Sequence, residues 1–516
     1  MAKYFLTTAI DYANGDPHIG HAYEKIGADA IARYRRMRGD DVHFLSGLDE
    51  HGQKVAQAAA ERGVSPQNFV DEIAERFTTM WQRLSISYDQ FVRTTAAPHK
   101  RGVRALIERI HERHPDDFYE KSYEGWYCVG CELFKRDDEI VDGKCVLHPT
   151  RDLQWTTERN WFFRLTRYES FIKDLLATRP RFLEPTTRRN EILALLDQGL
   201  EDISITRSRL SWAIPFPIKL PNGEEQGTWV WFDALPNYLT ATGFPDDGYE
   251  RLWPADLHVI GKDITRLHCV IWPAMLHAAG VSLPDRVWAH GFVNLSGERF
   301  SKSAGVRLDL NEAVDFRGAD ALRYFLLREV PFDGDGDFSW ERFEERYNSD
   351  LANTLGNLAS RALSMVEKYC DGVVPRGDAV SLDRADADDL AEYHASIEGS
   401  RGFLLNEALR RVMLCVARGN EFVQSSAPWA LAKRPDGRAE LETVLAGVVR
   451  QLARHAIYLA PFIPNKAQEL WTQLGGPGQV SEQRFDAAKS LDVTGWRVTK
   501  GASLFPKPEQ NKSLSS

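Results

Sequence analysis

The sequence is short of three features that would each point to a particular class of protein. It has no run of about eighteen apolar residues, the length that a membrane-spanning helix needs. It has no excess of basic residues: the formal net charge is −10, which argues against binding nucleic acid through bulk charge and leaves only local patches or specific contacts. Cysteine is scarce, with six in 516 residues, and this does not suit a disulfide framework.

The first residues, MAKYFLTTAIDYANG, also lack the cleavage pattern of a signal peptide. We therefore expect a cytoplasmic protein whose thiols stay reduced. What is present is the balance of an ordinary globular chain, with 43% hydrophobic and 27% charged residues. A chain of 516 residues is too long for one hydrophobic core, so we expect about three to four domains.

The N-terminal segment has the pattern of a strand, a helix and a second strand. Residues 3–10 (KYFLTTAI) are rich in the aromatic and β-branched types of a buried strand. Asp16 can cap a following helix, Pro17 fits its first position and Gly39 can end it. Together with the apolar run 42–46, this predicts a parallel βαβ unit, in which ligands bind where the first helix begins.

The alternation of strands and helices is interrupted once and then stops. From about residue 117 to 225 the chain is rich in aromatic residues and holds three of the six cysteines, which indicates an insertion. Strand-like and helix-like segments return at 228–235 and 257–263, and from about residue 346 the pattern is helical. The sequence therefore predicts an α/β protein whose parallel sheet is split by an insertion and followed by a helical domain.

One candidate phosphate-binding motif, His18-Ile19-Gly20-His21, lies at the predicted start of the first helix. The free N–H groups and the positive dipole end of a helix suit phosphate. Two histidines three residues apart share a face and can donate to phosphate oxygens, while a flat adenine could lie against Gly20. Two histidines near a turn fit solvated surface residues equally well.

A second candidate lies about 280 residues further on, at 299–305 (RFSKSAG). Lys302 stands between Ser301 and Ser303, and a loop ammonium there could stabilise the charge on a leaving pyrophosphate. Taken alone, the segment also fits an ordinary exposed loop.

Four residues of the insertion have the spacing of zinc ligands. Cys128 and Cys131 form one pair, and Cys145 and His148 form the other. Two such turns can deliver four ligands to a tetrahedral ion, which predicts a closed structural site rather than three unligated core thiols. The other cysteines have no such partners in the sequence, and we expect buried thiols without an assigned function at Cys269, Cys370 and Cys415.

The two separated motifs resemble the HIGH and KMSKS signatures of class I aminoacyl-tRNA synthetases. The first matches at all four positions, whereas the second has Arg299 and Phe300 where the family has lysine and methionine, and keeps Lys302. The chain is similar to methionyl-tRNA synthetases over nearly its whole length, in AIDYANGDPHIGH, LSGLDEHGQKV, VWFDALPNYL, HVIGKDITRLHCVIWPAM and the C-terminal helices. The insertion also resembles the single-zinc version in that family.

The resemblance implies an enzyme that activates L-methionine with ATP and transfers it to the 3′ end of tRNA(Met), initiator and elongator. It implies one structural Zn²⁺, and we expect Mg²⁺ with the ATP. We expect a monomer, because no dimerising module is visible. The implied domains are a Rossmann-like catalytic core at 1–116 and 226–280, a zinc-bearing insertion at 117–225, a stem-contact region with the KMSKS-like loop at 281–345, and an α-helical anticodon-binding domain at 346–516.

Carried over by position, the catalytic residues would be His18, His21 and Lys302, with Gly20, Ser301 and Ser303 also contacting ATP. The Asp49 carboxylate would hold the ammonium group of methionine, and aromatic side chains would surround its sulfur, which is polarisable and a poor hydrogen-bond acceptor. Each aromatic residue taken alone also fits plain core packing, and Trp272 fits either role. The implied methionine set is Ile10, Tyr12, Asp49, Trp231, Ala234, Tyr238, Ile264 and His268.

In the helical region, Asn357 and Arg361 stand one turn apart, and Trp429 follows a proline. An amide, a guanidinium and an indole can read unstacked bases, but the same groups also serve as helix caps and core residues. These positions match the anticodon-reading residues of the family. We therefore expect them to bind the CAU anticodon.

Two features of the chain separate it from related enzymes. Relatives that activate valine, leucine or isoleucine carry a much larger insertion than the roughly 110 residues found here, and a cysteinyl enzyme would place cysteine in a zinc-bearing catalytic pocket. Two rival interpretations are a nucleotidyltransferase without tRNA and a non-catalytic tRNA-binding relative. The helical third argues against the first, and the retention of both histidines and Lys302 argues against the second.

Overall fold

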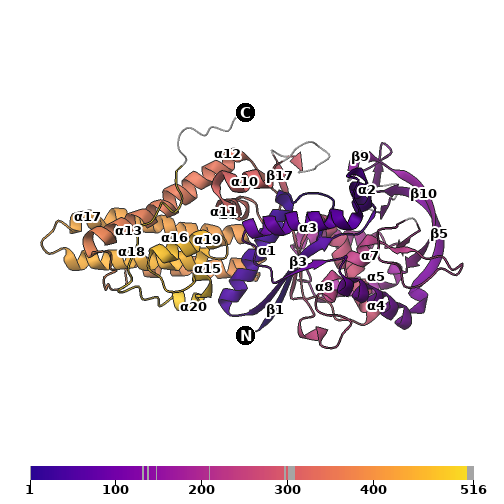
Figure 1. Ribbon diagram of the computed structural model, residues 1–516. Coiled ribbons are helices and arrows are strands. Elements are labelled where there is room, and N and C mark those ends of the chain that lie inside the picture. Colours follow the sequence, from indigo (N-terminus) through magenta and orange to yellow (C-terminus); the bar gives the residue numbers. More distant parts are fainter. Residues whose placement is uncertain are drawn as a thin grey trace.

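A computed structural model of the chain describes residues 2–130, 133–135, 139–146, 148–208, 210–295, 298–299 and 308–507. The molecule is elongated, with the β-sheets in one half and a bundle of long helices in the other (Figure 1). Among the described helices, none combines the length and apolar character that crossing a bilayer requires.

A parallel sheet forms the centre of the N-terminal half. Its order is β11 (Leu183–Glu184), β16 (Val287–His290), β15 (Leu257–Gly261), β1 (Lys3–Thr8) and β3 (Asp41–Asp49), and both β2 (Asp11–Tyr12) and β4 (Gln90–Arg93) pair with β3. Every pairing is parallel. Because β1 and β3 precede the inserted segment and β15 and β16 follow it, the predicted split parallel core is confirmed.

Successive residues of the strands point to opposite faces of this sheet. Leu6 and Phe44 pack in a core cluster with the apolar side of the first helix, whereas Phe5 and Leu45 belong to a second cluster on the other face. The helices of the first cluster include α1 (Ile19–Arg38), α2 (Gln53–Glu61), α3 (Pro66–Arg83), α10 (Leu310–Arg317) and α11 (Ala319–Glu329), and those of the second include α4 (Ala97–Arg113), α5 (Glu169–Thr178), α6 (Thr186–Asp197), α7 (Val230–Ala234), α8 (Asn237–Thr240) and α9 (Trp272–Ala279).

The first helix ends as predicted but begins later. Gly39 terminates α1 in the left-handed conformation, with φ of 101°. The prediction that Asp16 caps the helix is wrong, because His18 is the N-cap and its own side chain accepts the first backbone N–H groups. The Asp16 carboxylate instead accepts a hydrogen bond from Arg76 of α3, at 2.7 Å.

The inserted segment forms antiparallel sheets at the outer end of this half (Figure 1). The largest pairs β5 with β10 along their whole lengths. Its strands are β12 (Ile203–Ser204), β10 (Gln154–Phe163), β5 (Phe118–Cys128) and β6 (Leu133–Phe134). Two smaller antiparallel sheets comprise β7 (Ile140–Val141), β8 (Lys144–Cys145) and β9 (His148–Asp152), and β13 (Thr206–Arg207) with β14 (Gly227–Thr228). A separate small sheet follows the insertion in the sequence, in which β17 (Val293–Leu295) pairs antiparallel with β18 (Glu298–Arg299) and parallel with β19 (Gly336–Phe338).

The C-terminal third is a bundle of helices, which confirms the predicted helical domain. Its longest members, α16 and α18, lie side by side in the bundle. The elements are α12 (Trp340–Arg346), a π-helical stretch at Tyr347–Gly356, α13 (Asn357–Cys370), α14 (Ser381–Ala385), α15 (Ala387–Ile397), α16 (Leu405–Ser426), α17 (Pro428–Leu431), α18 (Arg438–Leu459), α19 (Pro464–Gln473) and α20 (Phe485–Ala488).

A buried arginine of α11 joins the two halves. The Arg323 guanidinium donates to the Asp29 carboxylate of α1 at 2.7 Å and to the Phe462 carbonyl, just beyond α18, at 2.8 Å. Both charged side chains are fully buried. Burial alone would raise the pKa of Asp29, but Arg33 and Arg323 lower it to about 2. The carboxylate is therefore ionised, and its pairing fixes α1 against the helical half.

Replacing this arginine should destabilise the fold strongly. Arg323→Met leaves Asp29 buried without one of its cations, and breaking a buried pair from one side costs about 3–5 kcal/mol. The free energy of unfolding, measured by urea titration at pH 7, should fall by that amount. The deficit should shrink as the pH falls from about 4 to about 2, because the unfolded chain protonates Asp29 near pH 4 whereas the folded wild type does so only near pH 2, and the stability that the pair contributes is lost over this range.

Arg342→Met is the matched control for this measurement. Arg342 pairs with Glu329 at 2.6 Å, but its side chain is 45% exposed. An exposed pair of this kind contributes less than about 1 kcal/mol. Equal losses in the two variants would contradict a special role for the buried arginine.

Candidate active site

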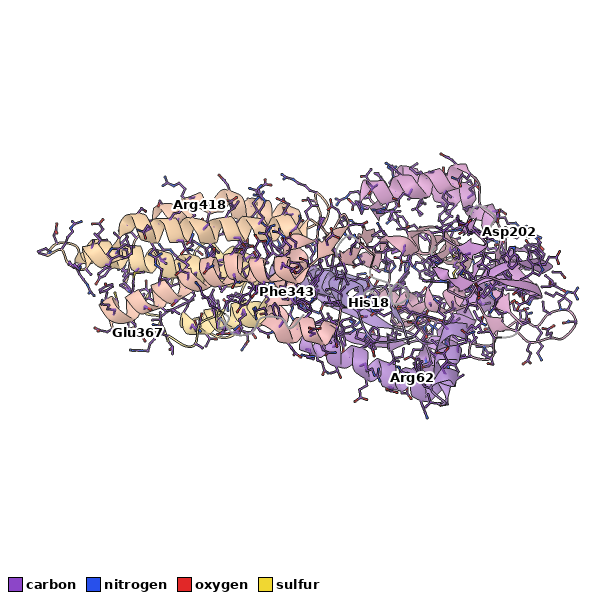
Figure 2. The ribbon with its side chains drawn as sticks, turned by 90° about the horizontal axis from the view of Figure 1, so that it is seen from above. His18, Arg62, Asp202, Phe343, Glu367 and Arg418 are labelled. Carbon is purple, nitrogen blue, oxygen red and sulfur yellow. The ribbon has the colours of Figure 1, made fainter. Side chains whose placement is uncertain are left out.

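The predicted phosphate-binding motif lies at the carboxyl edge of the parallel sheet, where α1 begins. The His18 Nδ1 accepts the backbone N–H groups of Gly20 at 3.1 Å and of His21 at 3.4 Å, and the His21 Nδ1 accepts the backbone N–H of His18 at 3.3 Å. The two rings stack, with centroids 3.5 Å apart. His18 lies in the sheet-bearing half, toward the helical bundle (Figure 2).

This reciprocal capping sets the tautomer of both histidines. A backbone N–H can only donate, so each Nδ1 must be unprotonated and the ring proton of the neutral form lies on Nε2. Both rings therefore carry an Nε2–H donor on the side away from the helix backbone. A Cβ added at Gly20 would lie 3.1 Å from the His18 ring, so glycine at this position leaves room for the capping geometry.

A cavity of about 780 Å³ opens beside His18. Its walls come from the loop before α1, from α3 and from the start of α10. Leu308, in the wall, directly follows residues 300–307, which lie outside the described part of the chain. Ser301, Lys302 and Ser303 belong to this segment. Only the backbone of Arg299 is described, in β18. The cavity thus lies between the first motif and the segment that begins at Leu308.

A buried charge network lies behind the histidine motif. The Lys25 ammonium donates to the carboxylates of Asp11 at 2.7 Å and Glu24 at 2.8 Å, and Glu24 accepts a hydrogen bond from His290, at the end of β16, at 3.1 Å. Because two carboxylates share one ammonium, burial raises the pKa of Asp11, whereas Lys25 lowers the pKa of Glu24 against the effect of burial. This network was not predicted from the sequence.

Several residues predicted for methionine lie together beside this edge. The Tyr238 hydroxyl lies 2.7 Å from the His268 Nε2, and the His268 Nδ1 lies 3.0 Å from the Ile264 carbonyl. A carbonyl only accepts, so Nδ1 carries the proton and Nε2 accepts from Tyr238. Burial lowers the pKa of His268 to about 4, so the ring is neutral at pH 7. Tyr238 also contacts Trp272, at 6.3 Å between ring centroids.

The remaining residues of that set are placed by the neighbouring elements. Tyr12 of β2 pairs in register with Asp49 at the end of β3, which is buried. Trp231 and Ala234 lie on α7, and Ala234 is buried. The half-buried members that pack against the same core cluster as Tyr238 are Ile10, Tyr12, Trp231 and Ile264.

One buried cluster that orients α7 was not predicted. The Asp233 carboxylate lies 2.6 Å from the His51 Nδ1 and 2.8 Å from the His99 Nε2, and His99 also contacts Thr240 of α8 at 2.8 Å. Burial alone would raise the pKa of Asp233, but the two histidines lower it to about 2. The partners stand 182 and 134 residues away in the sequence, so no local signal could have paired them.

The predicted zinc ligands are described only in part. Cys128 ends β5 and Cys145 ends β8, and both are buried. Cys145 pairs in register with His148 of β9. Cys131 and the side chain of His148 lie outside the described residues. The complete ligand set therefore stays a prediction.

The three residues predicted to read an anticodon gather in the helical half. Asn357 and Arg361 lie one turn apart on α13, and Trp429 lies on α17, near the far end of the bundle (Figure 1). The Arg361 guanidinium carbon is 5.7 Å from the centre of the Trp429 ring, whose side chain is 37% exposed. The Asn357 amide donates to Asn420 of α16 at 3.2 Å. The arrangement presents an indole and a cation to solvent.

Two family models and many known proteins match the chain. The model for "tRNA synthetases class I (M)" matches residues 4–152 and 136–363, and that for the "Anticodon binding domain of methionyl tRNA ligase" matches 383–514. The methionine–tRNA ligase of Caldanaerobacter subterraneus subsp. tengcongensis is 41% identical, over 99% of this chain and 80% of that protein. The methionine–tRNA ligase of Brucella suis biovar 1 is 42% identical, over 98% of both chains.

A solved structure agrees with these sequence matches. The Mycobacterium tuberculosis methionyl-tRNA synthetase in complex with methionyl-adenylate superimposes with a TM-score of 0.91, at 40% identity, covering 98% of this chain and all of that one. The matched ranges include both the split sheet with its histidine motif and the helical bundle. The chain therefore belongs to the methionine–tRNA ligase family of class I aminoacyl-tRNA synthetases.

Proposed function

We propose that the chain activates L-methionine with ATP, forming methionyl-adenylate and pyrophosphate, and transfers methionine to the 3′ end of initiator and elongator tRNA(Met). The observation that carries the proposal is the cavity beside the first of the two capped histidines, whose wall includes Leu308, just beyond the second signature motif in the sequence. Methionyl-adenylate is bound by a structural relative at 40% identity. We also propose, on the sequence evidence, a cytoplasmic monomer.

The capped histidines suit the binding of ATP. Nε2–H groups of His18 and His21 can donate to phosphate oxygens, and the start of α1 adds a positive dipole end. Lys302, with Ser301 and Ser303, would contact the leaving pyrophosphate, where an ammonium stabilises developing charge. Mg²⁺ bound with ATP would neutralise part of the phosphate charge.

The pocket around Tyr238 suits methionine. The Tyr238 hydroxyl and both ring nitrogens of His268 are engaged in hydrogen bonds with protein atoms, so the neighbouring surface is aromatic and uncharged. A polarisable sulfur gains about 0.3–1.5 kcal/mol from each aromatic contact. Asp49, buried at the end of β3, would hold the ammonium group of methionine.

The helical half would bind the anticodon, and the insertion would bind zinc. Trp429 can stack on an unpaired base while Arg361 donates to a base edge or phosphate. The buried thiols of Cys128 and Cys145 fit a structural Zn²⁺, which Cys131 and His148 would complete. The ion would hold the short strands of the insertion together.

The experiment that tests the proposal is amino-acid-dependent exchange of pyrophosphate into ATP, run with each of the twenty amino acids. We expect exchange with methionine alone. Lys302→Ala serves as the comparison, and its exchange rate should fall by roughly 10²–10³, because a transition-state contact worth about 3–4 kcal/mol is lost. Exchange with a different amino acid, or full activity of the variant, would contradict the proposal.

Tyr238→Phe tests the methionine pocket. The variant removes the hydrogen bond that holds His268, and a buried acceptor without a donor costs about 1–3 kcal/mol. We expect the KM for methionine to rise by roughly tenfold or more, while the KM for ATP changes less than about twofold.

The control for this variant is Tyr34→Phe. It removes another tyrosine–histidine contact, from Tyr34 to His394 at 2.9 Å, but at the boundary with the helical half. Its KM for methionine should stay at the wild-type value. A similar rise in both variants would argue for a general effect on folding instead of pocket geometry.

Arg361→Ala tests anticodon binding. Loss of the cation beside Trp429 should lower kcat/KM for tRNA by roughly 10–100-fold, since such base contacts contribute about 1–3 kcal/mol. The rate of pyrophosphate exchange should not change. Arg434→Ala, in an exposed cluster with Asp436, is the control and should behave as the wild type. Parallel losses in exchange and aminoacylation would contradict the role.

A further inference from the structure

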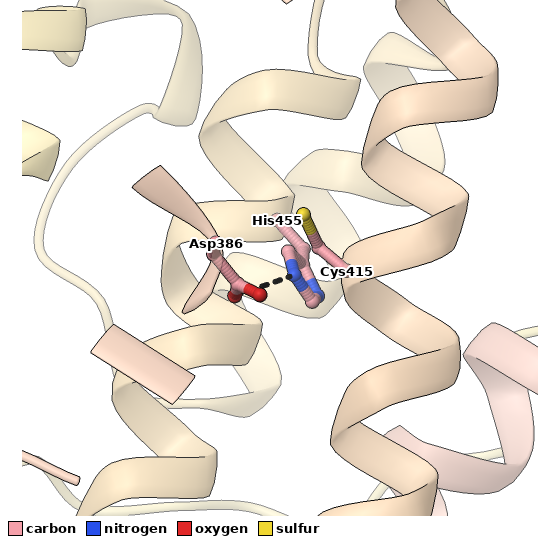
Figure 3. A group of neighbouring side chains, drawn as sticks. All are labelled: Asp386, Cys415 and His455. Atoms are coloured by element: carbon pink, nitrogen blue, oxygen red, sulfur yellow. Dashed lines mark ion pairs between the residues drawn. The ribbon is translucent and has the colours of Figure 1, made fainter. Parts of the chain in front are cut away.

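Three buried side chains of metal-ligating type meet in the helical domain. Asp386 lies between α14 and α15, Cys415 on α16 and His455 on α18, and their exposed fractions are 1%, 0% and 1% (Figure 3). One ligand atom of each lies within 4.8 Å of the others. The Asp386 Oδ2 and the His455 Nε2 are 3.9 Å apart.

His455 is the unusual member of this cluster. Among the described residues, neither of its ring nitrogens has a hydrogen-bond partner. A buried polar atom without a partner costs about 1–3 kcal/mol, and buried polar groups in native proteins are nearly always satisfied. Burial also lowers the pKa of the ring to about 3, so it stays neutral, the form in which imidazole binds metals.

The carboxylate of the cluster is held in place by neighbouring side chains. The Gln451 amide donates to the Asp386 Oδ2 at 2.7 Å and to the Cys415 carbonyl at 3.0 Å, and Arg418 donates to the Asp386 Oδ1. Outer contacts of this kind orient the ligands of metal sites. A carboxylate oxygen has two lone pairs, so the Asp386 Oδ2 can bind a cation while it accepts the hydrogen bond from Gln451.

The surrounding charges allow a divalent cation. Arg418 lies 3.8 Å from the Cys415 sulfur and pairs both with Asp386 of the cluster and, at 2.6 Å, with Asp389 outside it, so the two carboxylates share its charge. The Cys415 thiolate and the remaining charge of Asp386 would then offset a dication in large part. The set of one sulfur, one nitrogen and one oxygen donor suits Zn²⁺ better than Mg²⁺ or Ca²⁺, which prefer oxygen donors alone.

We propose that Asp386, Cys415 and His455 bind a Zn²⁺ ion inside the helical domain, separate from the cysteine pairs of the insertion. A water molecule would take the fourth position. Binding forms bonds from the metal to the thiolate sulfur, the imidazole nitrogen and a carboxylate oxygen, and one thiol proton is released to solvent. The ion links the start of α15 to α16 and α18 and so stiffens the bundle that carries Trp429.

Metal analysis of the full-length chain tests this site. Wild type, Cys415→Ala and Cys370→Ala are loaded with Zn²⁺, freed of excess metal and analysed for zinc per chain. Cys370, also a buried cysteine of the helical domain, is not a member of the cluster, so its variant is the matched control. We expect Cys415→Ala to hold one equivalent less zinc than the other two proteins. Equal zinc content in all three would overturn the proposal.

A second measurement on the wild type covers the case in which the variant fails to fold. The intact chain is treated with a thiol-alkylating reagent, with and without a chelator, and labelling is followed at each cysteine by peptide mass spectrometry. Removal of the metal should speed alkylation of Cys415 by roughly tenfold or more and leave the rate at Cys370 unchanged. A bound ion occupies the Cys415 sulfur and stabilises the folded bundle around it, so both effects slow the reagent. An unchanged rate at Cys415, or the same acceleration at both cysteines, would overturn the site.

Discussion

The structure depends on matching the charges that helix α1 carries into the interior. Lys25 is neutralised by Asp11 and Glu24, and Asp29 is neutralised by Arg33 and by Arg323 of α11. An unpaired buried charge costs several kcal/mol, so each partner must be in position when the chain is folded. The partners come from the sheet edge and from α11, which also contacts the backbone after α18. One helix thus aligns the histidine motif at its start, the sheet and the helical half.

The site at the sheet edge follows from this alignment. Helix α1 is capped by His18, which lines the cavity and exchanges capping hydrogen bonds with His21. Beside it, hydrogen bonds within the protein satisfy Tyr238 and His268 and leave an uncharged aromatic surface. Asp233, bound by His51 and His99, holds the helix that carries Trp231. Polar networks thus orient the residues proposed to bind methionine.

In the proposed function, the helical half would hold the anticodon-reading residues at a fixed place relative to the sheet. Trp429 and Arg361 lie near its far end, where they are open to solvent at least in part. The interior between that end and Arg323 contains apolar packing and the cluster of Asp386, Cys415 and His455. A cluster of this kind ties three helices together, so it acts on the rigidity of the bundle instead of on the chemistry at the sheet.

Sequence alone determined the parallel sheet with its insertion, the helical domain and the family, because strand and helix periodicity and the two signature motifs are local patterns. It could not determine contacts between distant segments. The cap assigned to Asp16 belongs to His18, since the path of the loop decides which side chain reaches the free N–H groups. Cys415, without a partner in the sequence, meets His455 forty positions later, and Asp233 meets His51 and His99. Such meetings depend on how helices pack, and only tertiary structure decides that.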